Sequence, residues 1–138
     1  MKSAIVKWVD GFQFIGQSGS GHSIVIDGDK SSGGGSAMTP MELLMIGLGG
    51  CSGMDVISVL NKKKQEVFDF KVNVSGNLAN EYPKRYTDMN LEFVVIGRNI
   101  DENAVKKAID LSMDKYCSVK ATLEGSAKIT FNYKIENI

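Results

Sequence analysis

The side chains of this chain that could do the most distinctive chemistry are its two cysteines, Cys51 and Cys117. They lie 66 positions apart, so only folding can bring their sulfurs together. A thiolate is a strong nucleophile, and once it is oxidised a second thiol can condense with it to a disulfide. The pair therefore raises the question of whether the two thiols meet in space and do redox chemistry together.

Cys51 is expected to lie inside a long helix. Thr39 as N-cap, Pro40 at the first helical position and Glu42 three residues after the cap form a capping box with a proline in its favoured place. The helix is predicted to cover 39–65, and apolar residues surround its first half. We therefore expect that half to be buried on all sides.

Glycine is unusually frequent around Cys51. A glycine inside a helix costs about 1 kcal/mol relative to alanine, and this helix holds Gly47, Gly49, Gly50 and Gly53. The sequence therefore predicts that neighbouring elements approach the helix backbone closely near Cys51.

A second helix should carry Cys117 in its last turn. Asp101 can cap it, and apolar residues recur at helical spacing from Val105 onward, with Ser112 inside the same stripe. Alternating patterns predict strands over residues 3–9, 12–17, 23–27, 68–75, 89–95 and 127–135. An Asp10-Gly11 pair between the first two predicts a hairpin. The predicted order is βββ-α-ββ-α-β, with a mainly antiparallel sheet, hence the α+β class.

The length of 138 residues suits one domain. Its predicted parts are N-terminal strands (3–27), a flexible Gly/Ser loop (28–38), the central helix (39–65) and a C-terminal part (66–138). One small sheet offers little cover for such an apolar helix. We therefore expect a homodimer that buries it.

The composition excludes several partners. Lys+Arg and Asp+Glu balance at 16 each, so no long-range field would recruit nucleic acid or an anionic membrane. No signal peptide is visible, and the longest uncharged apolar stretch, 43–54, is about half of the ~20 residues that a membrane span needs. The expected location is cytoplasmic, where cysteines are more often free or redox-active than structurally bridged.

The chain resembles the OsmC/Ohr family of thiol-dependent peroxide-detoxifying proteins of the oxidative and osmotic stress response. The resemblance lies in 40–44 leading to Gly49-Gly50-Cys51, and in 111–118 around Cys117; the run 50–55 is most similar to the OsmC-like branch typified by YhfA. It implies an OsmC-like fold and an intertwined homodimer with two sites at the interface. It also implies that Cys51 attacks an organic hydroperoxide, that Cys117 resolves the sulfenic acid, and that a dithiol reduces the resulting disulfide.

The activating residues of that family are not found at their expected positions. Its members use an arginine from the N-terminal strand region and a glutamate directly after the helix-start proline, but this chain has no arginine before Arg85 and has Met41 after Pro40. Glu42 lies one residue late, about 180° around the helix from Cys51, and capping explains it.

Other polar residues remain as candidates near the thiol. Asp55 follows Cys51 by one turn, and a carboxylate there would raise the pKa of the thiol rather than lower it. Replacement cations are conceivable, and the candidates are Lys7, Lys30, Lys115 and the lone histidine, His22. A lone histidine in a polar turn is more often a solvated loop residue.

A non-catalytic alternative stays open, because buried cysteines also serve as small apolar residues. On that hypothesis the dimer binds a small hydrophobic ligand and both cysteines are structural. A metal site is not expected, since two cysteines and one histidine lack zinc-type spacing. The Gly-rich run 33–35 lacks the dinucleotide-binding pattern, so no cofactor is expected either.

Overall fold

A computed structural model describes all 138 residues. They form two compact units, Met1–Leu44 and Met45–Ile138. The elements are β1 (Ala4–Asp10), β2 (Gln13–Ser18), β3 (Ser23–Ile26), the short 3₁₀ helix η1 (Lys30–Ser32), α1 (Pro40–Lys62), β4 (Glu66–Leu78), β5 (Tyr86–Arg98), α2 (Glu102–Leu111), the π-helix η2 (Ser112–Tyr116), α3 (Ser118–Leu123) and β6 (Lys128–Asn137). The predicted order of strands and helices is therefore confirmed, with three short helical segments added.

The N-terminal unit is an antiparallel sheet in the order β1-β2-β3. The predicted hairpin is present, with Asp10 paired to Gln13 across a turn made by Gly11 and Phe12. Gly11 has a φ of 54°, in the left-handed region that glycine tolerates best. The Nε1–H of Trp8 donates to the Gly11 carbonyl at 2.8 Å, which holds the turn closed.

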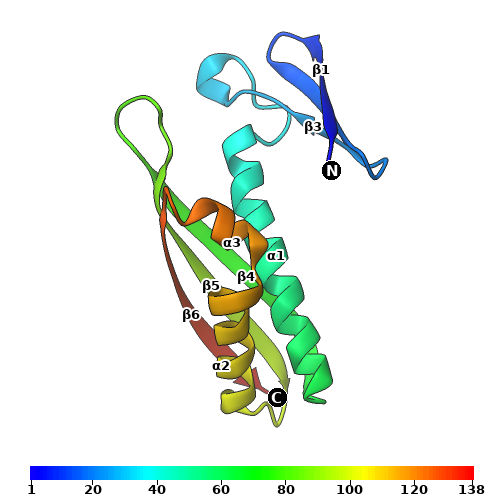
Figure 1. The fold of residues 1–138 in the computed structure, drawn as a ribbon, viewed down its shortest axis with the longest axis vertical. Helices are drawn as coiled ribbons and strands as arrows, with labels where there is room; N and C mark the ends of the chain where they lie inside the picture. The colour runs from blue at the N-terminus through cyan, green and yellow to red at the C-terminus, as the bar shows by residue number, and fades with distance from the viewer. The chain divides into compact units, whose positions relative to one another are not determined.

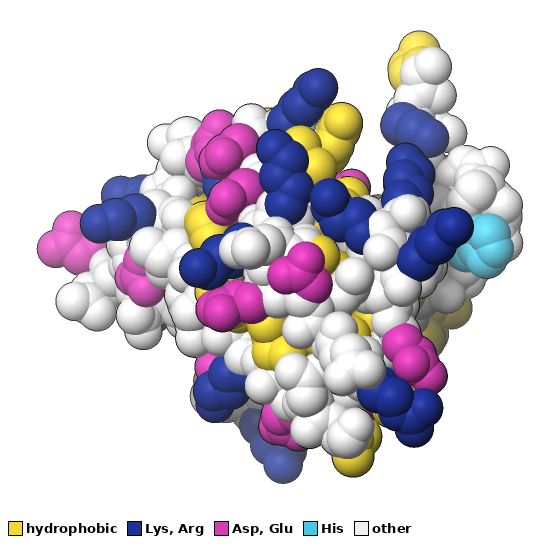
Figure 2. Space-filling model, turned by 90° about the horizontal axis from the view of Figure 1, so that it is seen from below, with side chains coloured by type: hydrophobic (Ala, Val, Ile, Leu, Met, Phe, Trp, Pro, Cys, Tyr) yellow, Lys and Arg dark blue, Asp and Glu magenta, His cyan; other side chains and the backbone are white.

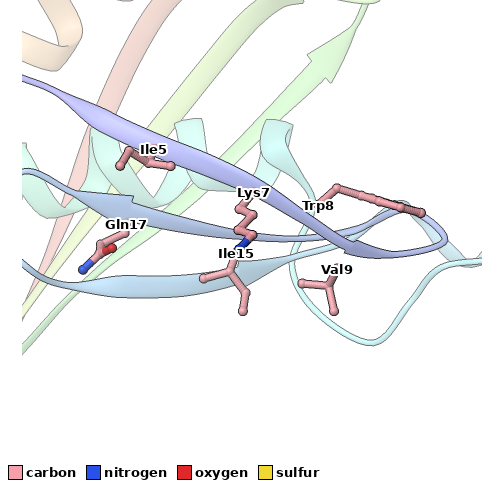
Figure 3. A pocket seen from close by; sticks show the side chains of 6 residues that line it. All are labelled: Ile5, Lys7, Trp8, Val9, Ile15 and Gln17. Carbon is pink, nitrogen blue, oxygen red and sulfur yellow. The ribbon is translucent and has the colours of Figure 1, made fainter.

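This small sheet leaves apolar side chains uncovered. Every residue of β1 is exposed, including Trp8 at 61% and Ile5 at 68%. A hollow of about 370 Å³ lies along the hairpin, and Figure 3 shows the side chains that line it. They are Ile5, Lys7, Trp8, Val9, Ile15 and Gln17. Exposed apolar surface of this kind marks a binding or interaction face.

The predicted flexible loop is tied to the end of β3 through Asp27. The Asp27 carboxylate accepts hydrogen bonds from the Ser36 hydroxyl at 2.5 Å, from the Ser36 N–H at 3.1 Å and from the Gly28 N–H at 2.7 Å. Farther along the loop, η1 is capped by Asp29. The flexibility of this segment stays a prediction, but its two ends are joined by defined contacts.

These contacts predict a pH dependence that Asp27 confers. The hydrogen bonds from Ser36, side chain first and then backbone, hold the pKa of the Asp27 carboxyl below its usual value. A carboxyl whose pKa is lowered on folding stabilises the fold above its unfolded pKa, and this contribution is lost as pH falls through the folded pKa. We expect thermal unfolding to show wild type more stable than Asp27→Asn at pH 6, and the difference to shrink below about pH 4. A constant difference across that range would contradict the assignment.

The start of α1 agrees with the predicted capping box. The Thr39 N–H donates to the Glu42 carboxylate at 2.9 Å, and the Glu42 N–H donates to the Thr39 hydroxyl at 3.2 Å. The helix ends at Lys62, three residues before the predicted end, and Lys64 then takes a φ of 55°. A left-handed residue just past the last turn is a common helix terminator.

The C-terminal unit is a second sheet, β4-β5-β6, whose helical face is covered by α1, α2 and α3 (Figure 1). Strands β4 and β5 form the expected antiparallel pair, with Val72 opposite Phe93. Strand β6 pairs in parallel with β5, whereas the other three strand pairs are antiparallel, so the prediction of a mainly antiparallel arrangement is confirmed. The parallel pairing follows from the helical crossover α2–α3, which returns the chain to the same end of the sheet.

The core lies between this sheet and the helices. Alternate residues of β5 (Leu91, Phe93 and Val95) are fully buried, and so are Leu48, Val56 and Leu60 of α1. The opposite face is polar, where Glu92 accepts from Asn73 and Asn132. Charges of both signs lie side by side on the face seen in Figure 2, in keeping with their equal numbers.

Two of the helix glycines allow the predicted close approach. A Cβ at Gly49 would lie 2.8 Å from the Val74 side chain, and one at Gly53 would lie 3.4 Å from Val72. Helix α1 therefore packs directly on β4. A Cβ at Gly50 would meet nothing, so the expectation holds for the sheet-facing glycines only.

The expectation that the first half of α1 is buried on all sides is wrong for the single chain. Ile46 is 56% exposed and Leu44 39%, and Met54, just past the midpoint, is 72% exposed. By length and composition α1 is also apolar enough to cross a membrane, a test that core helices of soluble proteins pass as well. One face of α1 packs on the sheet, and the opposite apolar face has no cover within this chain.

Candidate functional site: a two-thiol cluster

The structure brings both cysteines together, next to an acid. The sulfurs of Cys51 and Cys117 and a carboxylate oxygen of Asp55 all lie within 4.8 Å of one another. Cys51 and Asp55 come from consecutive turns of α1, and Cys117 comes from the segment between η2 and α3. Both thiols are free.

A π-turn sets the position of Cys117. Sequence periodicity placed this residue in the last turn of one regular helix, which is wrong, because α2 ends at Leu111 and η2 follows. The Cys117 N–H donates to the Ser112 carbonyl, five residues back, at 2.8 Å. In an α-helix, residues five apart point about 140° away from each other. The wider turn instead places Cys117 nearly above Ser112, on the side that faces α1.

Cys117 is buried and held by hydrogen bonds. It is 5% exposed, its sulfur lies 3.2 Å from the Ser52 hydroxyl, and the Lys120 N–H donates to it at 3.4 Å. Burial is the main cause that raises the pKa of the Cys117 thiol. Because Ser52 gives its one proton to the Leu48 carbonyl at 2.8 Å, its oxygen is left to accept from Cys117. Cys117 is therefore a protonated thiol in the reduced protein.

Cys51 is the more exposed of the two cysteines. It is partly exposed, whereas Cys117 is buried. Asp55, one turn further along α1, accepts a hydrogen bond from the buried Ser112 hydroxyl at 2.9 Å. That bond fixes the carboxylate beside the two sulfurs.

Two of the four cations that were considered as activators have other contacts. Lys115 stacks on the Tyr116 ring at 5.2 Å, and His22 contacts Ser20 in an exposed turn at 3.0 Å. Lys7 belongs to β1 and Lys30 to η1. No salt bridge joins Asp55 to a lysine or arginine in the chain. The arginines are likewise engaged, Arg85 with the carbonyls of Tyr86 and Ser126, and Arg98 with Glu66.

Two serines of the site escaped sequence reasoning. Ser52 follows Cys51 directly, and Ser112 sits inside the apolar stripe of the second helix. A polar residue in the middle of an apolar stripe signals a buried hydrogen bond, and Ser112 indeed has one. Its partner depends on how two helices align, which no local pattern encodes.

The fold and the paired thiols define a class of α+β proteins with a long central helix and one cysteine on each of two helical segments. The chain belongs to the OsmC-like family: the family model described as OsmC-like protein matches residues 33–132. Protein YhfA of Escherichia coli K12 is 44% identical over 132 residues, covering 96% of both chains.

Solved structures agree with this assignment. A hypothetical protein from Aquifex aeolicus VF5 is 32% identical, covers 99% of this chain and 98% of its own, and superposes with a TM-score of 0.83. The organic hydroperoxide resistance protein OhrB of Bacillus subtilis is 14% identical, with a TM-score of 0.65, 97% of this chain covered and 98% of its own. The likeness to OhrB shows a shared fold only, so the peroxidase members of the fold are distant from this chain.

Proposed function

We propose that this protein reduces organic hydroperoxides with Cys51 and Cys117, as part of a response to oxidative or osmotic stress. The observation that carries the proposal is the approach of the two sulfurs to within 4.8 Å of each other. A sulfenic acid formed on one cysteine would then have its resolving partner within reach of a side-chain rotation. OhrB, an organic hydroperoxide resistance protein with the same fold, supports the choice of substrate.

The different environments of the two cysteines support a separate role for each. Cys51 is partly exposed, so a hydroperoxide can reach it, and it acts as the peroxidatic residue. Its thiolate attacks the O–O bond; the sulfur keeps one oxygen as a sulfenic acid, and the other leaves as an alkoxide that takes a proton to become the alcohol. Cys117, buried and protonated at rest, then loses its proton and displaces water to form the disulfide. A dithiol reductant returns two electrons and two protons, and itself becomes a disulfide.

Intact mass spectrometry tests the pair directly. One equivalent of an organic hydroperoxide should remove two hydrogens from the reduced chain, and a dithiol should restore them. Peptide mapping should place the new bond between Cys51 and Cys117. An unchanged mass, together with slow alkylation of both native thiols, would favour the alternative of a non-catalytic ligand-binding protein with structural cysteines.

A homodimer is the partner that the uncovered surfaces support. Ile46 and Met54 on α1 are exposed in the single chain, and so are the apolar residues of β1. A stable interface buries about 800 Å² per subunit with an apolar centre, and such surfaces would supply it. A cytoplasmic location, where thiols stay reduced, fits the same proposal.

Sedimentation equilibrium should therefore give twice the 15.0 kDa of one chain. A glutamate at Ile46 would place a charge at the centre of the interface, so Ile46→Glu is expected to shift the protein toward monomer. Lys107→Glu, on an exposed position of α2, serves as the control and should stay dimeric. A monomeric wild type at micromolar concentration would contradict the proposal.

A further inference from the structure

The third member of the thiol cluster, Asp55, has no part in the proposed reduction of hydroperoxides. Its carboxylate oxygen nevertheless lies within 4.8 Å of both sulfurs. Two sulfur ligands and one oxygen ligand converging from two elements is an arrangement found in metal sites. We propose that Cys51, Asp55 and Cys117 bind a zinc-type divalent cation when both thiols are reduced.

The distances fit such a cation. With Zn–S bonds of about 2.3 Å and Zn–O bonds of about 2.0 Å, tetrahedral coordination separates ligand atoms by roughly 3.5 to 3.8 Å. All three ligand atoms already lie within 4.8 Å of one another. The difference is at most about 1.0 Å between the two sulfurs and about 1.3 Å between a sulfur and the oxygen, which side-chain rotation can close. Three protein ligands leave the fourth position open to water or a small anion.

The donor set selects the metal. Two thiolates disfavour the hard cations Mg²⁺ and Ca²⁺, which prefer oxygen. The carboxylate oxygen disfavours Cu⁺, which prefers soft ligands throughout. Zn²⁺ accepts both sulfur and carboxylate ligands in a tetrahedral site. The sequence count of two cysteines and one histidine missed this combination because Asp55 was not counted among the ligands.

Outer-sphere hydrogen bonds support the arrangement. Carboxylates that bind metals are themselves hydrogen-bonded, and the buried Ser112 hydroxyl donates to Asp55 at 2.9 Å. The Lys120 N–H points at the Cys117 sulfur at 3.4 Å, a bond that a metal-bound thiolate retains. The Ser52 hydroxyl lies 3.2 Å from the same sulfur, and in the metal-bound state it would turn its proton from the Leu48 carbonyl to the thiolate.

Metal and disulfide are mutually exclusive at this cluster. Binding converts both thiols to thiolates and releases their two protons to solvent. Oxidation of the same two sulfurs to a disulfide removes two ligands and sets the cation free. Bound zinc would thus protect Cys51 and Cys117 from oxidation, and oxidation of the two thiols would release the zinc. The metal site itself needs only the reduced geometry, so it does not rest on the peroxide chemistry.

Cobalt titration of the full-length reduced protein under nitrogen tests the site. One Co²⁺ per chain should bind with a thiolate-to-cobalt charge-transfer band and strong visible bands of tetrahedral coordination, and Zn²⁺ should abolish both. Cys51→Ser and Cys117→Ser should lose the charge-transfer intensity in part, and Asp55→Asn should weaken binding about 10-fold or more. Ser112→Ala, which acts through Asp55, should weaken it about 10- to 100-fold.

Asp114→Asn is the matched control, an exposed acid on η2 that lies outside the cluster and should bind cobalt as wild type does. Circular dichroism checks that each variant is folded. The proposal is overturned if the folded wild type shows no charge-transfer band, or if Asp55→Asn binds cobalt as tightly as wild type. If the wild type does not reduce hydroperoxides but still binds cobalt in this way, the proposed function is wrong and the metal site is supported.

Discussion

Replacing Cys51 with serine should abolish hydroperoxide reduction, and replacing Cys117 with serine should leave a single turnover. A serine hydroxyl at position 51 is not ionised near neutral pH, so the attack on the O–O bond loses its nucleophile. In Cys117→Ser the attack on the hydroperoxide still occurs, because Cys51 is partly exposed and unchanged. When no dithiol is added, the sulfenic acid then has no thiol in the chain to condense with.

The measurement separates these two results. Consumption of an organic hydroperoxide with a dithiol reductant should fall at least 10³-fold in Cys51→Ser, a loss typical of removing the reacting group. In Cys117→Ser, assayed without the dithiol, one equivalent should be consumed in a burst, with the chain heavier by one oxygen. Ser118→Ala, an exposed neighbour of Cys117, is the control and should keep the wild-type rate.

The reverse pattern would reassign the roles. If Cys117→Ser lost the burst and Cys51→Ser kept it, the buried thiol would be the one that meets the substrate. That outcome would require the segment between η2 and α3 to open, since Cys117 is 5% exposed in the closed structure. Equal rates in both variants and wild type would remove the thiols from the reaction altogether.

Local chemistry made part of this fold predictable from the sequence. The capping box of Thr39 and Glu42 involves groups three residues apart, and its hydrogen bonds are those expected. The strands follow from alternation, which depends only on each strand having one buried face. The helical face shared by Cys51 and Asp55 follows in the same way from their i, i+4 spacing.

The features that the sequence did not predict depend on how separate elements align. The hydrogen bond between Ser112 and Asp55 joins residues 57 positions apart. The parallel pairing of β6 depends on the path of the crossover helices, not on the strand's own pattern. The π-turn before Cys117 has the composition of an ordinary helix, because the extra residue per turn is stabilised by tertiary contacts rather than by propensity. Sequence reasoning could therefore name both cysteines without showing how they meet.

The core between the sheet β4-β5-β6 and the helices predicts the largest loss of stability. Phe93 lies on the central strand β5, is fully buried, and stacks on Phe70 with ring centroids 6.5 Å apart. Phe93→Ala removes this contact and leaves a cavity in the core between the sheet and the helices. Such truncations cost about 3 to 5 kcal/mol, a large share of the roughly 5 to 15 kcal/mol that stabilises a domain.

Urea unfolding followed by circular dichroism should show this loss as a lower midpoint. Phe131→Ala is the matched control, because Phe131 lies on the neighbouring strand β6 and is already 41% exposed. Phe131→Ala should lower the free energy of unfolding by about 1 kcal/mol, because the Phe131 side chain buries less apolar area on folding than that of Phe93. If the two variants unfolded at the same urea concentration, the core would not be centred on β5.

Since α1 and η2 are positioned by this core, Phe93→Ala should also slow disulfide closure between Cys51 and Cys117 under conditions where the variant remains folded. Phe131→Ala should not slow it.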